Sequence, residues 1–500
     1  MDRGNVYMGR ILLVDLDKGS CEEEELSEDL IEEYIGGAAI NLALYERFKD
    51  RDPVVLGTGL LTGTFAPAGC AGVLTGKSPV TDSVCHVPLL GQTAVELKYS
   101  GFDFVVILGK SEKPVRLWLH DELAEVAGAS DVWGKDVWET TDKLRFEHGD
   151  DYVQILCIGP AGEKGSLLAQ VSESYWGSRD IFGLGASLGK KKLKAIAMRG
   201  LGNLELAEGF FDECVQLKNE IASGRIRGFQ GLVPILESLG ADPGGLKALE
   251  ARVHRNIASF NCTYPYNSFV MIEEDPKLLK ESQKQEPGLL LTDPAGVASL
   301  LFLKEGLPAV LRKINRLGLE PAACGRILAQ QGVSNVSEAE KSLAAFLVEG
   351  FSLDGQGVEN VCGVAPWALP VHTEARLVQA SCLFSHSLPP RPALGSFEDF
   401  SVSQNPVERA RWWLERQATC LILGICPLSA LLSPELSLEK MAGLAAKACQ
   451  WDSLTEDAIL GKARGVVRKT AVLGRPKGKV PPAWQDPEFE SFSKGLLQGG

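Results

Sequence analysis

Several short motifs that mark metal and nucleotide chemistry are missing from this sequence. It contains no C-x-x-C pair, no H-E-x-x-H and no P-loop, so zinc-finger, ferredoxin-like, zincin and P-loop sites are not expected. Histidine is scarce, with six residues in 500. Positive charge is also in deficit: the net charge of −14 opposes a sequence-independent grip on nucleic acid, and we expect no nucleic-acid partner.

Long apolar runs are missing as well. Runs such as residues 104–108 (FVVIL) are far shorter than the roughly 20 residues of a membrane-spanning helix, so no span is expected. The first residues, MDRGNVYMGRILLVDLDKG, hold no long apolar region and no small-residue cleavage site, which argues against a secretory signal. The 12 cysteines are scattered, a pattern that favours reduced thiols in a cytoplasmic protein over a disulfide framework.

The first 205 residues have the character of a β-rich domain. Short β-branched runs alternate with Gly, Pro and Asp. They predict strands at residues 10–15, 54–58, 72–75, 102–109, 115–119, 153–158, 166–171 and 193–198. One helix is predicted over residues 27–47, where Ser27 precedes an acidic first turn.

After residue 206 the pattern becomes helical. Leu, Ala and Val recur with helical spacing in residues 207–223, 228–239, 294–317, 336–349, 405–418, 436–449 and 455–469. Residues 352–403 are predicted to form long loops, and the tail after residue 473 a loosely attached arm. We therefore predict an α+β protein: a β-rich domain at 1–205, a helical domain at 206–350, and a helical domain with long loops and the arm at 351–500.

Five groups of motifs in the first 200 residues occur in a specific order. They are residues 57–67 (GTGLLTGTFAP), 77–81 (KSPVT) with 96–103 (ELKYSGFD), 107–115 (ILGKSEKPV), 133–136 (WGKD), and 158–163 (IGPAGE) with 183–186 (GLGA) and 192–197 (KLKAIA). Each alone is weak, because short Gly and Pro motifs are common in turns. Together they resemble the N-terminal domain of the aldehyde ferredoxin oxidoreductases.

This resemblance implies a fold and a chemistry. Family members hold tungsten, or sometimes molybdenum, between two pterins, and a nearby [4Fe–4S] cluster passes electrons to ferredoxin. The N-terminal domain lies under the pterins, and helical domains cover them. The implied reaction interconverts aldehydes and carboxylates, with the cofactor carrying the chemistry.

The residues that should bind the cluster depart from the family pattern. The matching segment is 259–268 (SFNCTYPYNS), in which the cysteine positions read Asn261, Tyr264 and Ser268, while Cys262 is one residue out of register. The distant ligand is kept as Cys426, a vestigial metal ligand or simply a small buried residue. An iron–sulfur cluster needs about four thiolates, so we predict that the [4Fe–4S] cluster is absent.

The expected pterin contacts are altered too. Ala71 and Ile181 replace family arginines, and Pro88, Leu90 and Gly91 replace an Asn and a Gly pair. In the helical half Leu421 stands where the family has Asp. The candidate cofactor-binding residues that remain are Lys77, Ser78, Gly91, Arg179, Gly183, Leu184 and Gly185. His386 is a weak catalytic candidate, because a lone loop histidine is more often a surface residue.

Three functional readings follow. The preferred one is a degenerate, non-catalytic partner or scaffold subunit, in a homo-oligomer or in a heteromer with an active paralogue or a ferredoxin-type subunit. The alternative is an active tungsten or molybdenum pterin oxidoreductase with altered cofactor contacts, since backbone N–H groups can hold phosphates whatever the side chains. A third is a different small ligand in the vacated cleft. Whether the chain is an enzyme stays open here.

Overall fold

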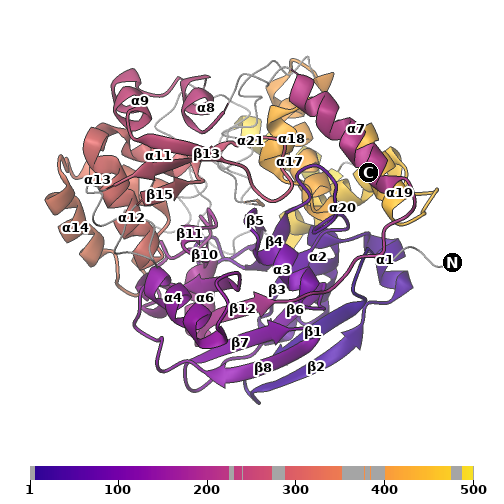
Figure 1. The fold of residues 1–500 in the computed structure, drawn as a ribbon, viewed down its shortest axis with the longest axis horizontal. Coiled ribbons are helices and arrows are strands. Elements are labelled where there is room, and N and C mark those ends of the chain that lie inside the picture. The colour runs from indigo at the N-terminus through magenta and orange to yellow at the C-terminus, as the bar shows by residue number, and fades with distance from the viewer. Residues whose placement is uncertain are drawn as a thin grey trace.

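The computed structural model describes residues 6–224, 230–238, 240–272, 288–351, 377, 383–384, 400–473 and 487–498. Figure 1 shows the strands β1, β2, β7 and β8 along the lower side of the molecule, with β4 and β5 nearer its middle. The later elements form two groups on the opposite side, one around α11–α14 and one around α17–α20. The α+β class predicted from the sequence is confirmed, whereas the domain boundaries stay a prediction.

The first sheet has six strands in the order β2-β1-β6-β3-β4-β5. Strands β1 and β6 run parallel and the other neighbours antiparallel. Strands β3, β5 and β6 are buried along their whole length, as expected where both faces of a sheet are covered. The bounds are β1 (Arg10–Asp15), β2 (Ser20–Glu25), β3 (Val54–Thr58), β4 (Gly72–Lys77), β5 (Val84–Leu89) and β6 (Phe104–Leu108).

The second sheet has the order β11-β10-β9-β12-β7-β8, with β12 and β7 parallel. Its strands are β7 (Val115–His120), β8 (Leu123–Gly128), β9 (Gln154–Ile158), β10 (Val171–Glu173), β11 (Trp176–Gly177) and β12 (Leu193–Arg199). The helices of this half are α1 (Glu28–Tyr34), α2 (Gly37–Arg47), η1 (Lys49–Arg51), α3 (Thr93–Tyr99), α4 (Val137–His148), α5 (Pro160–Glu163) and α6 (Leu184–Lys190).

The rest of the chain is mainly helical but contains a third, antiparallel sheet of β13 (Val253–Ile257), β14 (Asn267–Met271) and β15 (Gly288–Leu291). The helices are α7 (Phe210–Ser223), α8 (Val233–Ser238), α9 (Pro243–Glu250), α11 (Pro294–Leu300), η3 (Leu301–Gly306), α12 (Leu307–Leu317), α13 (Pro321–Gln330), α14 (Val336–Ala345), α17 (Pro406–Leu423), α18 (Pro427–Leu432), α19 (Leu438–Ala448), α20 (Glu456–Leu473) and α21 (Pro487–Gln498).

Three predicted elements need correction. The strand predicted at 166–171 is mostly a loop, because Gln170 bonds to the α12–α13 turn through its backbone and its side chain, and β10 begins only at Val171. The helix predicted over 27–47 is two helices, broken at Ile35, whose φ is 67° and whose carbonyl accepts from Tyr7. Residues 487–498, expected in a loose arm, form α21, in which Phe492 is buried.

The stretch Pro294–Leu317 is long and apolar enough for a membrane span by length and composition alone. In the structure 72% of its most apolar window is buried inside the protein, as in a core helix. Lys304, at φ 48°, also interrupts the helical path between α11 and α12. A single helix but no membrane span was predicted over 294–317, because charged residues divide its apolar runs; the structure divides this helix into α11, η3 and α12.

Candidate functional site

Side chains and backbone groups of the family-type motifs in the N-terminal half form hydrogen bonds and an ion pair with one another. The buried Lys194 ammonium lies 2.5 Å from a carboxylate oxygen of Glu163 and donates to the carbonyls of Lys135 and Ile158. The Glu163 carboxylate in turn accepts from the Gly134 N–H at 2.8 Å. Residues from three separate motifs thus form one buried network, which stabilises the fold itself.

The ELKYSGFD motif has a similar structural role. The buried Lys98 ammonium donates to the carbonyls of Gly59 and Leu60, and burial lowers its pKa to about 8. Asp103 accepts from the backbone N–H groups of Met8 and Gly9. Burial raises the pKa of Asp103 to about 6. Both charged groups therefore hold backbone segments of the N-terminal domain.

A carboxylate fills the first candidate anion site. Gly91 was predicted to contact a cofactor, but its N–H donates to both Glu173 oxygens at 3.1 Å. The Leu90 N–H donates to the same carboxylate at 3.0 Å, and the Thr93 hydroxyl donates at 2.5 Å. A Cβ on Gly91 would lie 2.7 Å from Glu173, so the glycine allows this close approach. Burial raises the pKa of Glu173.

A second carboxylate fills the turn predicted around Gly183, Leu184 and Gly185. Asp180 accepts from the backbone N–H groups of Phe182 and Gly185, both at 3.0 Å. Burial raises the pKa of Asp180 to about 7, while backbone donors including the Leu184 N–H oppose that rise. Backbone donors at the predicted cofactor contact Gly91 and in the predicted Gly183–Gly185 turn are thus occupied by carboxylates, and this donor set does not fit a pterin phosphate.

Lys77, Ser78 and Arg179 have partners within the protein. The exposed Lys77 pairs with Asp82 at 2.5 Å. The buried Ser78 hydroxyl donates to the Phe182 carbonyl at 2.8 Å and accepts from the N–H groups of the following turn. Arg179 donates to the Thr292 carbonyl through Nε at 3.0 Å and through Nη2. Ser78 and Arg179 thus join separate segments of the fold.

The segment predicted to have lost cluster ligands lies beside Cys426, the residue that the family resemblance gives as the distant ligand. Asn261 donates to the carbonyls of Thr64 and Ala66, which anchors the segment to the N-terminal domain. The Tyr266 hydroxyl lies 3.6 Å from the Cys426 sulfur. The Cys262 sulfur lies 3.1 Å from the Ser429 hydroxyl. Two thiols and a phenol therefore gather at the start of α18.

A third thiol, Cys70, was missed by sequence reasoning. Burial would raise the pKa of the Cys426 thiol, but hydrogen bonds from Cys70, the Ser429 N–H and Tyr266 lower it to about 6. Only its place beside the GTGLLTGTFAP motif could have drawn attention to Cys70, because it lies far from Cys426 in sequence. Among the residues that the structure describes, no three His, Cys, Asp or Glu side chains are placed to hold a metal ion.

His386 lies outside the described residues. A different histidine, His86, sits in the core at 0% exposure between the hydroxyls of Thr75 and Thr470, at 2.8 and 2.9 Å. Burial lowers its pKa to about 3, which keeps the ring neutral. His86 is therefore a satisfied core residue that links β5 to α20.

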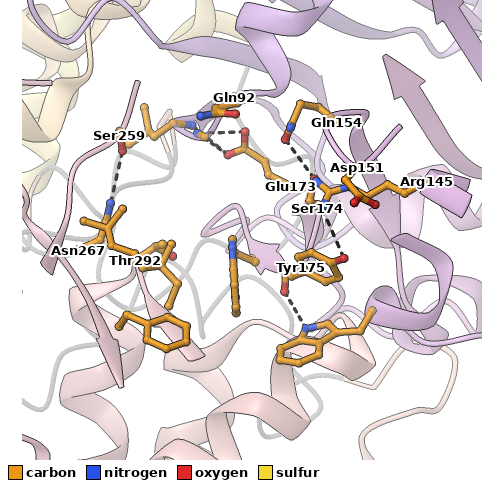
Figure 2. A pocket seen from close by; sticks show the side chains of 18 of the residues that line it. Gln92, Arg145, Asp151, Gln154, Glu173, Ser174, Tyr175, Ser259, Asn267 and Thr292 are labelled. Atoms are coloured by element: carbon orange, nitrogen blue, oxygen red, sulfur yellow. Dashed lines mark hydrogen bonds between the residues drawn. The ribbon is translucent and has the colours of Figure 1, made fainter. Parts of the chain in front are cut away.

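A cavity of about 1130 Å³ opens between α4, the β9–β11 edge and the β13–β15 sheet. Figure 2 shows Ser259, Asn267 and Thr292 on one side, facing Gln154 and Tyr175 across open space. The Asn267 amide donates to the Ser259 hydroxyl at 3.4 Å, and that hydroxyl lies 2.7 Å from the Tyr266 hydroxyl. A chain of polar contacts thus joins the cavity wall to Cys426.

Comparisons with known proteins agree with the motifs. The family described as "Aldehyde ferredoxin oxidoreductase, N-terminal domain" matches residues 11–200. The tungsten-containing aldehyde ferredoxin oxidoreductase of Pyrococcus abyssi is 36% identical over 275 residues, which are 53% of this chain and 42% of that enzyme. The match to the enzyme of Pyrococcus horikoshii is 35% identical with the same coverage. The matched part is thus less than half of these relatives' length.

Two further matches extend this result. An "Aliphatic sulfonate oxidoreductase, WOR-like subunit" of Pyrococcus furiosus is 30% identical over 40% of this chain and 35% of that subunit. The solved "Active site complex BamBC of Benzoyl Coenzyme A reductase in complex with 1,5 Dienoyl-CoA" aligns with a TM-score of 0.77 and 16% identity, over 99% of this chain and 94% of the other, which shows a shared fold. On its motifs and these matches, residues 11–200 belong to the aldehyde ferredoxin oxidoreductase N-terminal domain family, and the chain is similar to members of that enzyme family over about half of its length.

Proposed function

We propose that this chain is a non-catalytic member of the aldehyde ferredoxin oxidoreductase family that binds neither a tungsten pterin nor a [4Fe–4S] cluster. The observation that supports this most is the pair of internal carboxylates. Glu173 and Asp180 accept from the backbone N–H groups of Gly91, a predicted cofactor contact, and of Gly185 in the predicted Gly183–Gly185 turn. A pterin phosphate would have to displace a buried carboxylate at each turn, against charge repulsion.

The cluster ligands support the same proposal. Asn261, Tyr264 and Ser268 stand where the family motif has cysteines, and Asn and Ser side chains are poor ligands for soft iron–sulfur sites. Asn261 and Ser268 already have partners, since Asn261 bonds to Ala66 and Ser268 to Asn256. These side chains stabilise the local fold and are not held ready for a metal.

The role we propose is that of a partner or scaffold subunit in the cytoplasm. One relative is itself named as a WOR-like subunit of an oxidoreductase. The partner would be a second copy of this chain, an active paralogue or a ferredoxin-type subunit. The net charge of −14 favours a partner with a neutral or basic face.

Acid-released pterin tests the proposal. Full-length chain would be purified from a tungsten-competent host, denatured in acid, oxidised and examined for pterin fluorescence, with an active family enzyme from the same host as the positive control. We expect no pterin signal and no aldehyde oxidation with a viologen acceptor. A stoichiometric pterin signal would refute the proposal.

The alternative is an active tungsten or molybdenum oxidoreductase that converts aldehydes and carboxylates through altered contacts. One observation favours it: the three thiols Cys70, Cys262 and Cys426 interact, and the pKa of Cys426 is lowered to about 6, which suits a thiolate ligand. The same experiment separates the two functions, because the alternative predicts both pterin release and aldehyde oxidation.

A further inference from the structure

We propose that the outer face of α7, together with the adjoining Phe65, binds a basic amphipathic helix of a partner protein. This surface would serve the partner role proposed above, on which the inference rests. Three features of the surface carry it: an aromatic pair that is exposed to solvent, a fixed backbone beneath that pair, and neighbouring carboxylates that have no cation.

Two phenylalanine side chains meet on the surface of the protein. Phe65 is 50% exposed and Phe211 is 55% exposed, and their rings meet edge to face with centroids 5.1 Å apart. Val215, one turn further along α7, is 39% exposed. Residues four positions apart lie on the same face of a helix, so Phe211 and Val215 form one apolar ridge beside Phe65. Adjoining exposed apolar side chains are typical of protein-interaction surfaces, whereas single ones are common everywhere.

This ridge is separate from the face by which α7 packs on the protein. The buried residues of α7 are Phe210, Cys214, Leu217 and Ile221. Their spacing is that of an amphipathic helix with one face in the core. Figure 1 shows α7 at the outer edge of the molecule, beside α19. The ridge of Phe211 and Val215 therefore adds a second apolar face, which points to solvent.

The backbone that carries Phe65 is fixed on both sides. Thr64 and Ala66 are buried, and the Asn261 side-chain amide donates to their carbonyls at 3.2 and 2.7 Å. The Thr64 hydroxyl also donates to the Leu61 carbonyl at 2.8 Å. Phe65 thus projects from a segment that hydrogen bonds already hold, so little conformational entropy is lost when a partner covers its ring.

Carboxylates without a cation lie next to the ridge. Glu208 precedes α7, Asp212 lies in its first turn, and both are exposed. Within the described part of the chain neither forms an ion pair, whereas Glu213 pairs with a lysine of α19 at 3.8 Å. Lys218, the only basic residue of α7, donates to the Asn261 side chain. A partner that brings Lys or Arg beside an apolar anchor would neutralise these unpaired charges.

Shape and charge together select the occupant of this surface. A ridge of residues four apart on an exposed helix packs into the groove of another helix. A second copy that used the same face would place its own Glu208 and Asp212 against these carboxylates, and like charges repel. The carboxylates also oppose an anionic membrane. The occupant that matches both properties is an amphipathic helix with Lys or Arg beside its apolar residues.

Fluorescence anisotropy of labelled model helices, titrated with the full-length chain, tests the inference. One probe is a synthetic amphipathic helix of Leu and Lys, and the other replaces each Lys by Glu. We expect the Leu–Lys helix to bind at least tenfold more tightly than the Leu–Glu helix, by a margin that shrinks as salt rises. Equal affinity of the two probes would overturn the inference, as would no binding of the Leu–Lys helix at micromolar concentration.

Aromatic variants locate the binding site. Phe65→Ala and Phe211→Ala should each weaken binding of the Leu–Lys helix about tenfold, because exposed aromatic anchors dominate such contacts. Phe302→Ala is the matched control, since Phe302 is also exposed but belongs to η3. Circular dichroism checks that each variant is folded. Undiminished binding by the folded double variant would overturn the inference, as would an equal loss in Phe302→Ala.

Asp212→Asn tests the charge of the surface. It should weaken binding of the Leu–Lys helix about threefold and reduce the salt dependence, as expected for one exposed ion pair. Asp457→Asn is the matched control, because Asp457 is also an exposed aspartate in the first turn of a helix, α20. Both substitutions change the net charge by the same amount. An equal loss of affinity in the two variants would mean that only net charge attracts the probe, which would contradict the inference.

Sedimentation of the chain without a probe tests the remaining occupant. A wild-type dimer that Phe211→Ala dissociates would assign this face to a second copy and overturn the inference. The non-catalytic role proposed above fails by a different result, namely pterin released from the purified protein. A chain that holds no pterin and does not bind the Leu–Lys helix would refute the surface alone, so the two failures are distinguishable.

Discussion

At the scale of single residues, Glu173 and Asp180 place carboxylates against the backbone donors of Gly91 and Gly185, two residues that the family resemblance gives as cofactor contacts. Lys194 and Glu163 likewise form a buried charge pair whose atoms also bond to carbonyls and N–H groups inside the fold. Buried charges persist only where they are paired and hydrogen-bonded. Charged residues of these motifs therefore act mainly on stability.

Asp180→Asn should change how stability depends on pH. Burial raises the pKa of Asp180 to about 7 in the folded protein, above its unfolded value of about 3.8. A raised carboxyl pKa means that the folded state binds an extra proton between these values, so wild-type stability falls as pH rises from about 4 to 7. The Asn variant cannot titrate, and its advantage over wild type should grow across this window by up to about 1.4 kcal/mol per pH unit.

Chemical denaturation at half-unit pH steps measures this difference. The exposed Asp212→Asn is the control and should parallel wild type throughout. A constant gap between wild type and Asp180→Asn from pH 4 to 7 would show that Asp180 keeps an ordinary pKa.

Lys194→Met should destabilise the protein by about 3–5 kcal/mol, because it leaves the buried Glu163 carboxylate without its cation. The matched control is Lys192→Met, whose ammonium lies over the Trp133 ring, 5.1 Å from its centroid, and should cost about 0.5–1 kcal/mol. Urea unfolding of both variants gives the comparison. Equal losses would mean that the Lys194 network contributes little.

At the scale of elements, α2 and α17 join the N-terminal sheet to the C-terminal helices. Gly37 opens α2 at φ 46°, and a Cβ there would lie 1.7 Å from the Leu421 carbonyl oxygen. A Cβ on Gly59 would likewise clash with the Gly424 backbone. The N–H groups of Leu60 and Leu61 donate to the carbonyls of Ile422 and Leu423. Gly37, and Gly59 in the GTGLLTGTFAP motif, thus permit close backbone contact between segments that are distant in sequence.

Gly37→Ala should therefore lower the free energy of unfolding by several kcal/mol, on the order of 3 or more, since neither the backbone angle nor the space admits a side chain. Gly461→Ala in α20 is the matched control, because nothing lies within 4 Å of its Cβ position. That substitution, inside a helix, should raise the free energy of unfolding by about 0.5–1 kcal/mol. Thermal unfolding followed by circular dichroism distinguishes the two. A stable Gly37→Ala variant would contradict the packing described for α2 and α17.

The sequence predicted the longer apolar strands and about half of the described elements, and the misses have physical causes. Strand β1 was predicted at its observed bounds because apolar residues dominate it. Strand β2 (SCEEEE) was missed because its glutamates lower β-propensity, although charge is common on an edge strand. Strand β13 (VHRNI) was missed because it is short and polar and gains its order from pairing with β14.

The candidate site was less predictable than the fold. Gly91 and Gly183–Gly185 were predicted from local motifs to contact the cofactor, but Glu173 lies 82 residues from Gly91, and no local sequence pattern predicts that pairing. The contact of Cys70 with Cys426 likewise arises from tertiary structure. Sequence motifs locate backbone turns, whereas the group that occupies them depends on long-range packing.

At the scale of the whole molecule, the fold is shared with a solved neighbour, and residues of the chain itself bond to the groups that were expected to contact a cofactor. One solved neighbour shares the fold over 99% of this chain. Side chains of the family-type motifs bond to one another inside the fold, as Lys194 does to Glu163 and Lys98 to the Gly59 carbonyl. The proposed role, that of a partner or scaffold subunit, rests on these internal contacts.

The metal content of the purified protein tests this account most directly. The full-length chain would be expressed in a host that loads tungsten into an active family enzyme, and tungsten, molybdenum and iron would be measured per chain by inductively coupled plasma mass spectrometry. We predict far less than one equivalent of each metal. One tungsten with four irons per chain would contradict the claim that internal carboxylates and substituted ligands have replaced the cofactors.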